Sequence, residues 1–445
     1  MMKHIATVVA GHLLVFAAAT NAVAATHHVP DDYHTISAAI QASVNGDVIQ
    51  VAVGTFHENN LALGGKGITI QGTLSSEGDH ETIIDAQQQQ TVFMLNSGEG
   101  VATVIKDLHI TGCGVSGIYC HDTSPIITNC KFTGITSWDS GAGIQCWGSG
   151  SVRITGCTIT GNTAAGRGGG IFCSQNAAII TGCTITGNTT NTSSGGGIYC
   201  GFQTNPTISG CTISHNTAHE SGGGIFAEQH SSPHISDCTI SDNTAQGTEI
   251  YQGGGGIYFF SLSTPSVTNC HITDNTATHS SGGGIFLYFQ SSPIITGSTI
   301  TGNMAPHGKG GGIYCDLGSR PMISSSTIRG NTPHGIFKKH GSSRSGQLDT
   351  GHVILDDTTI CDNGDETFQF QVSGLVMHAG ENYIHTNCDA GASPGDMDGD
   401  GDVDMDDLSQ LHVELGTCQH DVNHDGSTNV LDLLEVVAGW NTDCQ

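Results

Sequence analysis

The sequence contains few charged side chains and very few basic ones. Of its 445 residues, 12 are Lys or Arg and 40 are Asp or Glu, which gives a formal net charge of −28. A chain with so few cations has no basic face that could neutralise a phosphate backbone, which argues against a nucleic-acid partner. The charged fraction of 12% is also atypical of a coiled coil or of an ordinary helical enzyme.

Long hydrophobic runs are missing beyond the first 24 residues. The one such run, IATVVAGHLLVFAAAT, follows Lys3 and His4 and precedes the small-residue sequence AVA at 22–24. This order predicts a signal peptide over 1–24 and an exported chain that begins near Ala25. No later stretch approaches about 20 apolar residues, so we expect no membrane-spanning helix and a secreted protein, extracellular or at the cell surface.

Glycine, by contrast, is abundant, with 64 residues arranged in a repeated pattern. An isoleucine follows the glycines mostly 26–28 residues apart, a second isoleucine keeps step with it, and an asparagine comes three residues after the second. A fixed period of this size is typical of a solenoid. Gly, Thr, Ser and Asn are poor in helix interiors, whereas Ile and Thr favour strands. The pattern therefore predicts a parallel β-helix with two or three short strands per coil, stacked about 4.8 Å apart.

Each repeated position has a structural role in this interpretation. The isoleucines fill the interior, and the asparagines lie at tight corners where stacked amides bond each other and the turning backbone. The members of the asparagine column are Asn162, Asn188, Asn216, Asn243, Asn275, Asn303, Asn331 and Asn363.

The GGGI…NT repeat resembles the right-handed β-helix repeats of the pectate-lyase-like superfamily, and it is similar to the repeats of polymorphic outer-membrane proteins. The resemblance covers roughly residues 30–385 and implies the right-handed coil. We therefore expect an all-β fold, a right-handed parallel β-helix over 25–388. Thr35 is expected to cap a short helix that ends at Asn45 and Gly46 and covers the open end of the stack. VIQVAVG is expected to be the first strand.

The 16 cysteines fall largely into two columns in register with the repeat. Stacked side chains point in parallel about 4.8 Å apart, which is beyond the usual bridge spacing. Buried thiol ladders are therefore favoured over disulfides within the repeat, with Ser298 and Ser326 replacing thiols in one column. Cys388, Cys418 and Cys444 lie outside the repeat and are better candidates for bridges.

Acidic residues are concentrated at the C-terminus, where residues 389–445 hold fourteen Asp or Glu and no Lys or Arg. Two segments, DMDGDGDVDMDDL and DVNHDGSTNVLDL, place oxygen-bearing residues at the spacing of a calcium loop, with a glycine at the sharp bend. The predicted Ca²⁺ ligands are Asp396, Asp398, Asp400, Asp402, Asp404, Asp407, Asp421, Asn423, Asp425, Ser427, Asn429 and Asp432.

The two loops resemble the duplicated calcium repeat of type I dockerins, because each ends in Asp-Leu and each precedes a short apolar helix. The resemblance implies a small α-helical module over 389–445 and a cohesin-like partner. Positions ten and eleven, Met405 with Asp406 and Val430 with Leu431, depart from the polar contact residues of dockerins. A role in folding or in capping the rod therefore stays open.

Aromatic residues follow the ladder isoleucines and should alternate to the outside of the coil. A row of exposed rings could stack on sugar faces, or it could shield backbone and pack beneath loops. The candidate ligand-binding residues are Tyr119, Phe172, Tyr199, Phe226, Tyr258, Phe286 and Tyr314.

The sequence shows no recognisable set of catalytic residues. β-Helix enzymes that act on acidic polysaccharides usually combine Asp clusters with an Arg or Lys base, and that combination is not evident. His215, Asp242 and Asp274 precede successive corner asparagines and could bind a cation, although solvated turn residues fit better. The leading prediction is a secreted non-catalytic protein, a scaffold or adhesin-like rod or a carbohydrate binder. The alternative is a polysaccharide lyase, hydrolase or epimerase.

Overall fold

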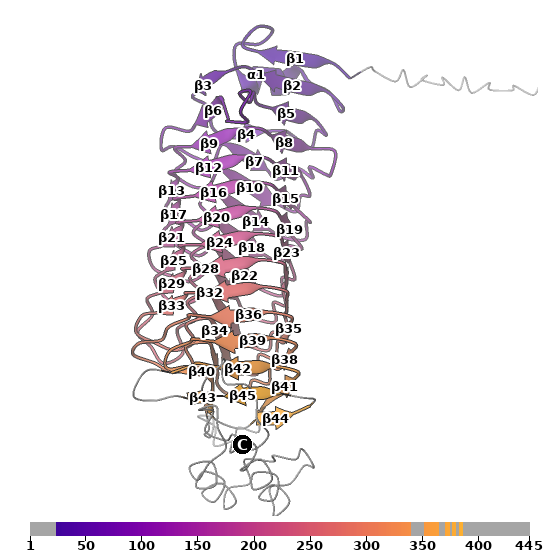
Figure 1. Ribbon diagram of the computed structural model, residues 1–445. Helices are drawn as coiled ribbons and strands as arrows, with labels where there is room; N and C mark the ends of the chain where they lie inside the picture. Colours follow the sequence, from indigo (N-terminus) through magenta and orange to yellow (C-terminus); the bar gives the residue numbers. More distant parts are fainter. Residues whose placement is uncertain (1–23, 340–350, 365–369, 374–375, 380–381, 386–445) are drawn as a thin grey trace, which may run out of the picture.

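The computed structural model describes residues 24–339, 351–364, 370–373, 376–379 and 382–385. Within these residues the chain winds into a rod of stacked coils (Figure 1). The predicted signal peptide and the predicted calcium module both lie outside the described residues.

The N-terminal end of the rod is covered by the predicted helix. Helix α1 (Ile36–Ala42) begins after Thr35, whose side chain accepts a 3.1 Å hydrogen bond from the backbone N–H of Ala38. Its apolar face is buried at Ile36, Ala39 and Ile40. The helix ends at Ala42, earlier than the predicted end at Asn45 and Gly46.

The first strand differs from the prediction. The segment VIQV forms β2 (Val48–Val51), and β1 (Thr26–Val29), which precedes the helix, pairs with it in parallel. The sequence pattern missed β1 because this strand lies before the first repeat.

Each coil contributes to three long parallel sheets, and some coils add a fourth short strand. The strands of the 14-stranded sheet A are β1, β2, β5 (Thr69–Gln71), β8 (Val104–Lys106), β11 (Ile126–Thr128), β15 (Arg153–Thr155), β19 (Ile179–Thr181), β23 (Thr207–Ser209), β27 (His234–Ser236), β31 (Ser266–Thr268), β35 (Ile294–Thr296), β38 (Met322–Ser324), β41 (Val353–Asp356) and β44 (Val376–His378).

The 13-stranded sheet B has its strands next along each coil. They are β3 (Gly54–Phe56), β6 (Thr82–Asp85), β9 (His109–Thr111), β12 (Lys131–Thr133), β16 (Thr158–Thr160), β20 (Thr184–Thr186), β24 (Thr212–Ser214), β28 (Thr239–Ser241), β32 (His271–Thr273), β36 (Thr299–Thr301), β39 (Thr327–Arg329), β42 (Thr359–Cys361) and β45 (Tyr383–His385).

The 12-stranded sheet C carries the ladder isoleucines and the aromatic column. Its strands are β4 (Leu61–Ala62), β7 (Phe93–Leu95), β10 (Ile118–His121), β14 (Ile144–Trp147), β18 (Ile171–Ser174), β22 (Ile198–Gly201), β26 (Ile225–Ala227), β30 (Ile257–Phe260), β34 (Ile285–Tyr288), β37 (Ile313–Cys315), β40 (His334–Lys338) and β43 (Phe370–Ser373).

A six-stranded short sheet D lies between sheets B and C along the chain. Its strands are β13 (Thr136–Ser137), β17 (Thr163–Ala164), β21 (Thr189–Thr190), β25 (Thr217–Ala218), β29 (Thr244–Ala245) and β33 (Thr276–Ala277).

The asparagine column is a hydrogen-bonded ladder, as predicted. The Oδ1 atom of Asn216 accepts 3.0 Å bonds from the backbone N–H and from the Nδ2 of Asn188, and its own Nδ2 donates to the carbonyl of Ile185 at 2.9 Å. Asn243 repeats the arrangement one coil further along. Because these amides are fully buried, each corner satisfies the backbone groups that the turn leaves unpaired.

The cysteine columns are also ladders. Cys211 Sγ accepts a 3.4 Å bond from the backbone N–H of Cys183, and Ser298 Oγ accepts the equivalent bond from Cys270 at 3.1 Å. The hydrogen bond with Cys157, together with burial, raises the pKa of the Cys183 thiol to about 12, so this thiol stays neutral. Twelve described cysteines are free and buried, which confirms the prediction of thiols for them, whereas Cys361 is disulfide-bonded.

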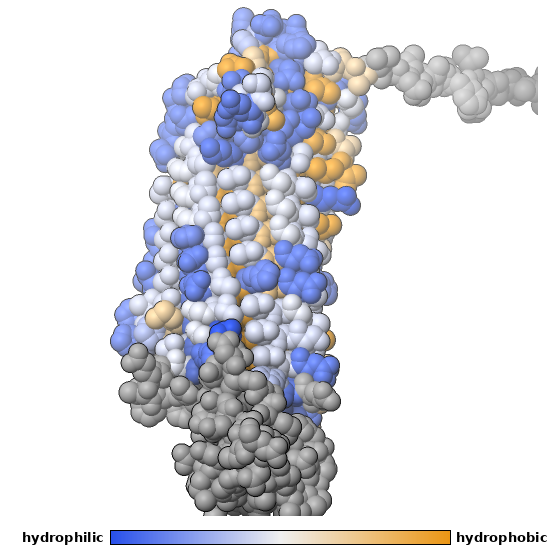
Figure 2. All heavy atoms as spheres, in the orientation of Figure 1, coloured by the Kyte–Doolittle hydropathy of each residue, from blue (hydrophilic) through white to orange (hydrophobic). Residues whose placement is uncertain are grey.

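One face of the rod is seen in Figure 2, in the orientation of Figure 1. Figure 2 shows rows of residues of intermediate hydropathy running along this face, with hydrophilic residues gathered toward the N-terminal end. Among the residues that the structure places, no helix has the length and hydrophobicity needed to cross a bilayer.

Candidate functional site

The aromatic column is a second core and not an exposed stripe. The rings of Phe172 and Tyr199 stack 5.1 Å apart, and those of Tyr258 and Phe286 stack 4.8 Å apart. The buried members, each exposed by no more than 7%, are Phe172, Tyr199, Phe226, Tyr258, Phe286 and Tyr314. Of the two alternatives for the aromatic column, packing beneath loops is therefore the one that these six rings adopt.

The loops that carry the glycines explain this burial. A Cβ atom at Gly195, where φ is +73°, would lie 2.7 Å from the carbonyl oxygen of Ile198 and 3.0 Å from the Cβ of Tyr199. The loop therefore lies directly against the aromatic column, and only glycine permits this approach. Strand alternation correctly put the rings outside the coil, but it gave no information about what covers them.

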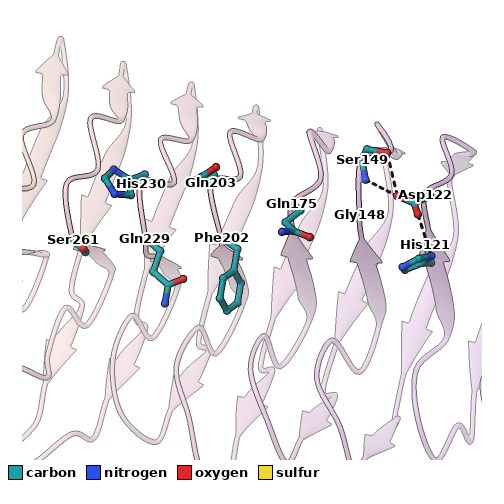
Figure 3. Close-up of a pocket in the computed structure, with 10 residues that line it drawn as sticks. All are labelled: His121, Asp122, Gly148, Ser149, Gln175, Phe202, Gln203, Gln229, His230 and Ser261. Carbon is teal, nitrogen blue, oxygen red and sulfur yellow. Dashed lines mark hydrogen bonds and ion pairs between the residues drawn. The ribbon is translucent and has the colours of Figure 1, made fainter.

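A groove lies at the edge of sheet C, where each coil turns toward sheet A. Its volume is about 820 Å³, and the turns after six successive strands, β10 to β30, contribute to it. The residues that line this coil-edge groove are His121, Asp122, Gly148, Ser149, Gln175, Phe202, Gln203, Gln229, His230 and Ser261 (Figure 3). Five inter-strand steps give it a length of about 24 Å.

Residues in the turns that build the groove adopt a left-handed backbone conformation. Gln203 and His230, with φ of 61° and 62°, adopt a region that L-residues rarely occupy. In Figure 3, Phe202 and Gln229 project to one side of the row of turns, and Gln203 and His230 to the other. Because the backbone geometry recurs in the six coils that build the groove, side chains meet it at regular intervals along the rod.

An imidazole and a carboxylate adjoin at the N-terminal end of the groove. His121 Nδ1 lies 3.4 Å from Asp122 Oδ2, and Asp122 Oδ1 accepts bonds from the Ser149 backbone N–H at 2.8 Å and from its hydroxyl at 3.1 Å. The backbone hydrogen bond from Ser149, followed by that from its hydroxyl, lowers the pKa of Asp122. The carboxylate is therefore held ionised beside the imidazole.

Tyr119 lies beside this pair on the same strand. Its ring is parallel to that of His121, with the centroids 6.4 Å apart. Burial, followed by the negative charges of Asp139 and Asp122, raises the pKa of its phenol. Tyr119 is half-buried, so it differs from the six covered members of the aromatic column, and its phenol is neutral.

A cation lies beside the middle of the groove. The Arg167 guanidinium carbon is 5.1 Å from the ring centroid of Tyr199 and 6.0 Å from that of Phe202. Arg167 Nη1 lies 3.9 Å from Glu228 Oε1, and the hydroxyl of Tyr199 donates to the same Glu228 oxygen. Nothing in the local sequence of Arg167 indicates that its side chain reaches across to the next coil.

Two buried polar atoms on this face of sheet C lack partners. Gln145 Oε1 and Ser174 Oγ make no hydrogen bond in the described part of the chain. Ser174 precedes the lining residue Gln175 and is in register with Gly201 on β22. Such groups are costly in isolation and are often found where a ligand supplies the missing partner.

The cation site considered for the exposed corner residues is not formed. His215 Nε2 and Asp242 Oδ2 are 3.9 Å apart, and both side chains are largely exposed. Within the described ranges, no group of three or more His, Cys, Asp or Glu side chains is arranged to hold a metal ion. The predicted Ca²⁺ ligands from Asp396 to Asp432 lie outside those ranges.

The family model described as "right handed beta helix region" matches residues 90–261, 142–304 and 253–396. The chain belongs to the right-handed β-helix family. This membership confirms the predicted right-handed β-helix, and the described coils bear out the predicted parallel sheets. No curated protein matches the chain.

Solved β-helix structures resemble this chain in fold. The periplasmic alginate epimerase AlgG is 12% identical, with a TM-score of 0.39, over 71% of this chain and 76% of its own. The A-module of the mannuronan C-5 epimerase AlgE6 of Azotobacter vinelandii is 13% identical, with a TM-score of 0.43, over 79% and 93%. Tailspike protein 3 of bacteriophage CBA120 is 12% identical, with a TM-score of 0.38, over 79% and 56%.

These comparisons overturn the leading functional prediction of a non-catalytic scaffold, adhesin-like rod or carbohydrate binder. The similar structures include alginate and mannuronan epimerases, which agree with the alternative prediction of a polysaccharide-active enzyme. At such identities the likeness shows the fold alone. The activity therefore has to be argued from the residues of this β-helix.

Proposed function

We propose that this β-helix is a polysaccharide-active enzyme. The coil-edge groove binds the glycan, and His121 with Asp122 supplies acid–base chemistry at the N-terminal end of the groove. The observation that carries the proposal is this pair in a groove that crosses six coils.

The shape of the groove favours an extended polymer. A length of about 24 Å along the rod is suited to several sugar units in a row. Its lining offers the amides of Gln175, Gln203 and Gln229 and the hydroxyls of Ser149 and Ser261. Amides and hydroxyls both donate and accept hydrogen bonds, as sugar hydroxyls require, and the ring of Phe202 supplies an apolar contact.

The chemistry of the pair favours proton transfer. Imidazole is a common general acid and base in enzymes, and Asp122 Oδ2, which lies 3.4 Å from Nδ1 of His121, can orient the ring. The neutral phenol of Tyr119, whose ring lies parallel to that of His121, is a further hydrogen-bonding group beside the pair. Hydrolysis by two facing carboxylates is less well supported, because Asp122 is the single carboxylate among the groove's lining residues.

The proposal is tested with the purified chain and a panel of acidic and neutral polysaccharides. Products are detected by the absorbance of unsaturated ends, by chain shortening and by proton exchange in D₂O. We expect one of these products, and we expect His121→Asn to lower the rate by about 100-fold or more, the range of general acid–base catalysis.

His215→Asn is the matched control. His215 is also exposed and also lies beside an aspartate, at 3.9 Å, but it is outside the groove. It should retain full activity. An absence of product from every polysaccharide, or equal loss in both variants, contradicts the proposal.

We also propose that the chain is secreted, which the signal-peptide pattern of residues 1–24 supports.

We further propose that Asp396 to Asp432 form two Ca²⁺ loops of a dockerin-like module, with a cohesin-like domain as its partner. The spacing of the carboxylates and glycines supports the two Ca²⁺ loops. Titration of the full chain with Ca²⁺ should give two sites, and Asp400→Asn with Asp425→Asn should remove them. Unchanged Ca²⁺ binding in the double variant contradicts the assignment.

A further inference from the structure

We propose that Arg167 forms a subsite for the carboxylate of an acidic sugar, in the middle of the coil-edge groove and away from His121 and Asp122. This inference rests on the proposed function and names its substrate class. It assigns a specific residue to the recognition of charge in the glycan.

The backbone of Arg167 is held by hydrogen bonds, and its guanidinium lies over two aromatic rings. Its backbone N–H donates to Ser140 Oγ at 3.1 Å, and its carbonyl accepts from Gly141 at 2.9 Å. Its side chain extends to the next coil, over the rings of Tyr199 and Phe202. A cation fixed over aromatic rings loses little conformational freedom when it binds a ligand.

The guanidinium keeps its hydrogen-bond donors available. Glu228 is its one ion-pair partner, at 3.9 Å, which is longer than a hydrogen bond, and the nearest Glu228 oxygen already accepts from the Tyr199 hydroxyl. In the part of the chain that the structure describes, the guanidinium makes no hydrogen bond. Its planar pairs of N–H groups match the two oxygens of a carboxylate, which would form a bidentate contact.

The surroundings of Arg167 favour a ligand at this point. The Arg167 side chain is 41% exposed. Phe202, below it, lines the groove and can pack against a sugar ring. Ser174 projects from the same face of sheet C, because its neighbour Cys173 points into the core, and its buried hydroxyl has no partner among the described residues.

Charge complementarity also points to an acidic sugar. The ten residues that line the groove include no Lys or Arg. With a net charge of −28, the chain as a whole repels polyanions. A fixed arginine beside the groove therefore attracts the carboxylate of a glycan locally, although the negative field of the whole chain repels it. This attraction should weaken with added salt.

The position of the subsite separates binding from chemistry. Phe202 follows β22, which is three strands from β10, so the subsite lies about 14 Å from His121. Arg167 cannot touch the sugar that reacts at His121. It should therefore act as a binding residue, and its removal should raise KM and leave kcat nearly unchanged.

The test compares one polyuronate in two forms, with free carboxylates and with the same carboxylates converted to methyl esters. The wild-type chain should bind the free-acid form about tenfold more tightly, the range of a charge-assisted hydrogen bond. Arg167→Gln should abolish this preference and raise KM for the free acid without lowering kcat. Arg167→Lys, which keeps the charge but loses the planar pairs of donors, should retain part of the preference.

Arg153→Gln is the matched control, because Arg153 is exposed on sheet A and outside the groove. It should bind both forms like the wild-type chain, and melting curves should show that all variants are folded. An unchanged preference in Arg167→Gln, or equal binding of both forms by the wild-type chain, overturns the subsite but leaves the proposed function standing. Binding of neither form overturns the subsite, and an absence of product from every polysaccharide overturns the proposed function itself.

Discussion

At the scale of single residues, each repeated position of this β-helix has one structural task. Asn216 shows this most clearly, because its amide bonds the backbone of the preceding coil at two points, the N–H of Asn188 and the carbonyl of Ile185. The sequence predicted this task, since a buried polar residue that recurs at a corner must satisfy backbone groups. It also predicted the thiol ladder, because parallel side chains cannot approach closely enough to form a bridge.

The same residue-scale argument did not decide between the two alternatives for the aromatic column. Alternation along a strand determines that Ile198 points in and Tyr199 points out. It does not determine whether the outer side meets solvent or a covering loop. In this protein the glycine loops cover it, so Tyr199 is fully buried.

A residue-scale prediction concerns His334. Burial, followed by the nearby charge of Lys309, lowers its pKa from 6.5 to about 4 in the folded chain. The neutral form is therefore favoured on folding. Its contribution to stability should be fully present above pH 6.5 and should be lost as the pH falls toward 4, because the unfolded chain then binds the additional proton.

This dependence can be checked by melting curves between pH 4 and pH 7.5. We expect His334→Gln to flatten the fall in melting temperature below pH 6.5. His271→Gln, at an exposed position of β32, is the control. Its melting temperature should change with pH as that of the wild-type chain does. If the melting temperatures of the wild-type chain and His334→Gln fall equally with pH, His334 is not the cause of the pH dependence.

At the scale of elements, the sequence predicted the strands and the capping helix but not the groove. The groove depends on turns such as Gln203 and His230, where residues other than glycine adopt a positive φ. A signal was present, since pairs of polar or aromatic residues, such as His121 with Asp122 and Gln229 with His230, recur just after the strands of sheet C. It was hidden by variation in residue type, because the turns share a backbone shape and not a side chain.

An element-scale prediction separates backbone strain from crowding in the glycine loops. Gly156 and Gly195 both have positive φ, but a Cβ at Gly156 would meet nothing within 4 Å, whereas one at Gly195 would lie 2.7 Å from a carbonyl oxygen. Gly156→Ala should therefore destabilise by about 1 kcal/mol, the cost of the left-handed conformation. Gly195→Ala should destabilise by about 1–3 kcal/mol more, the range found for overpacking. Denaturant unfolding measures both, and equal losses would show that the loop does not press on the aromatic column.

At the scale of the whole molecule, stacking converts a local turn into a long surface. One coil presents one or two side chains to the groove, whereas six successive coils present a continuous row (Figure 3). A short local sequence cannot reveal such a site, because its members are about one repeat apart in the chain. Sequence periodicity predicted the rod, and only the folded coils bring His121, Phe202 and Ser261 into one line.

The account is tested most directly by a crystal structure of His121→Asn with an oligosaccharide of the polymer that the wild-type chain modifies. We expect the sugar chain to lie along the coil-edge groove, with a reacting unit at position 121 and a further unit against Phe202. Sugar bound elsewhere on the rod, or an empty groove at a concentration that saturates binding in solution, would contradict it.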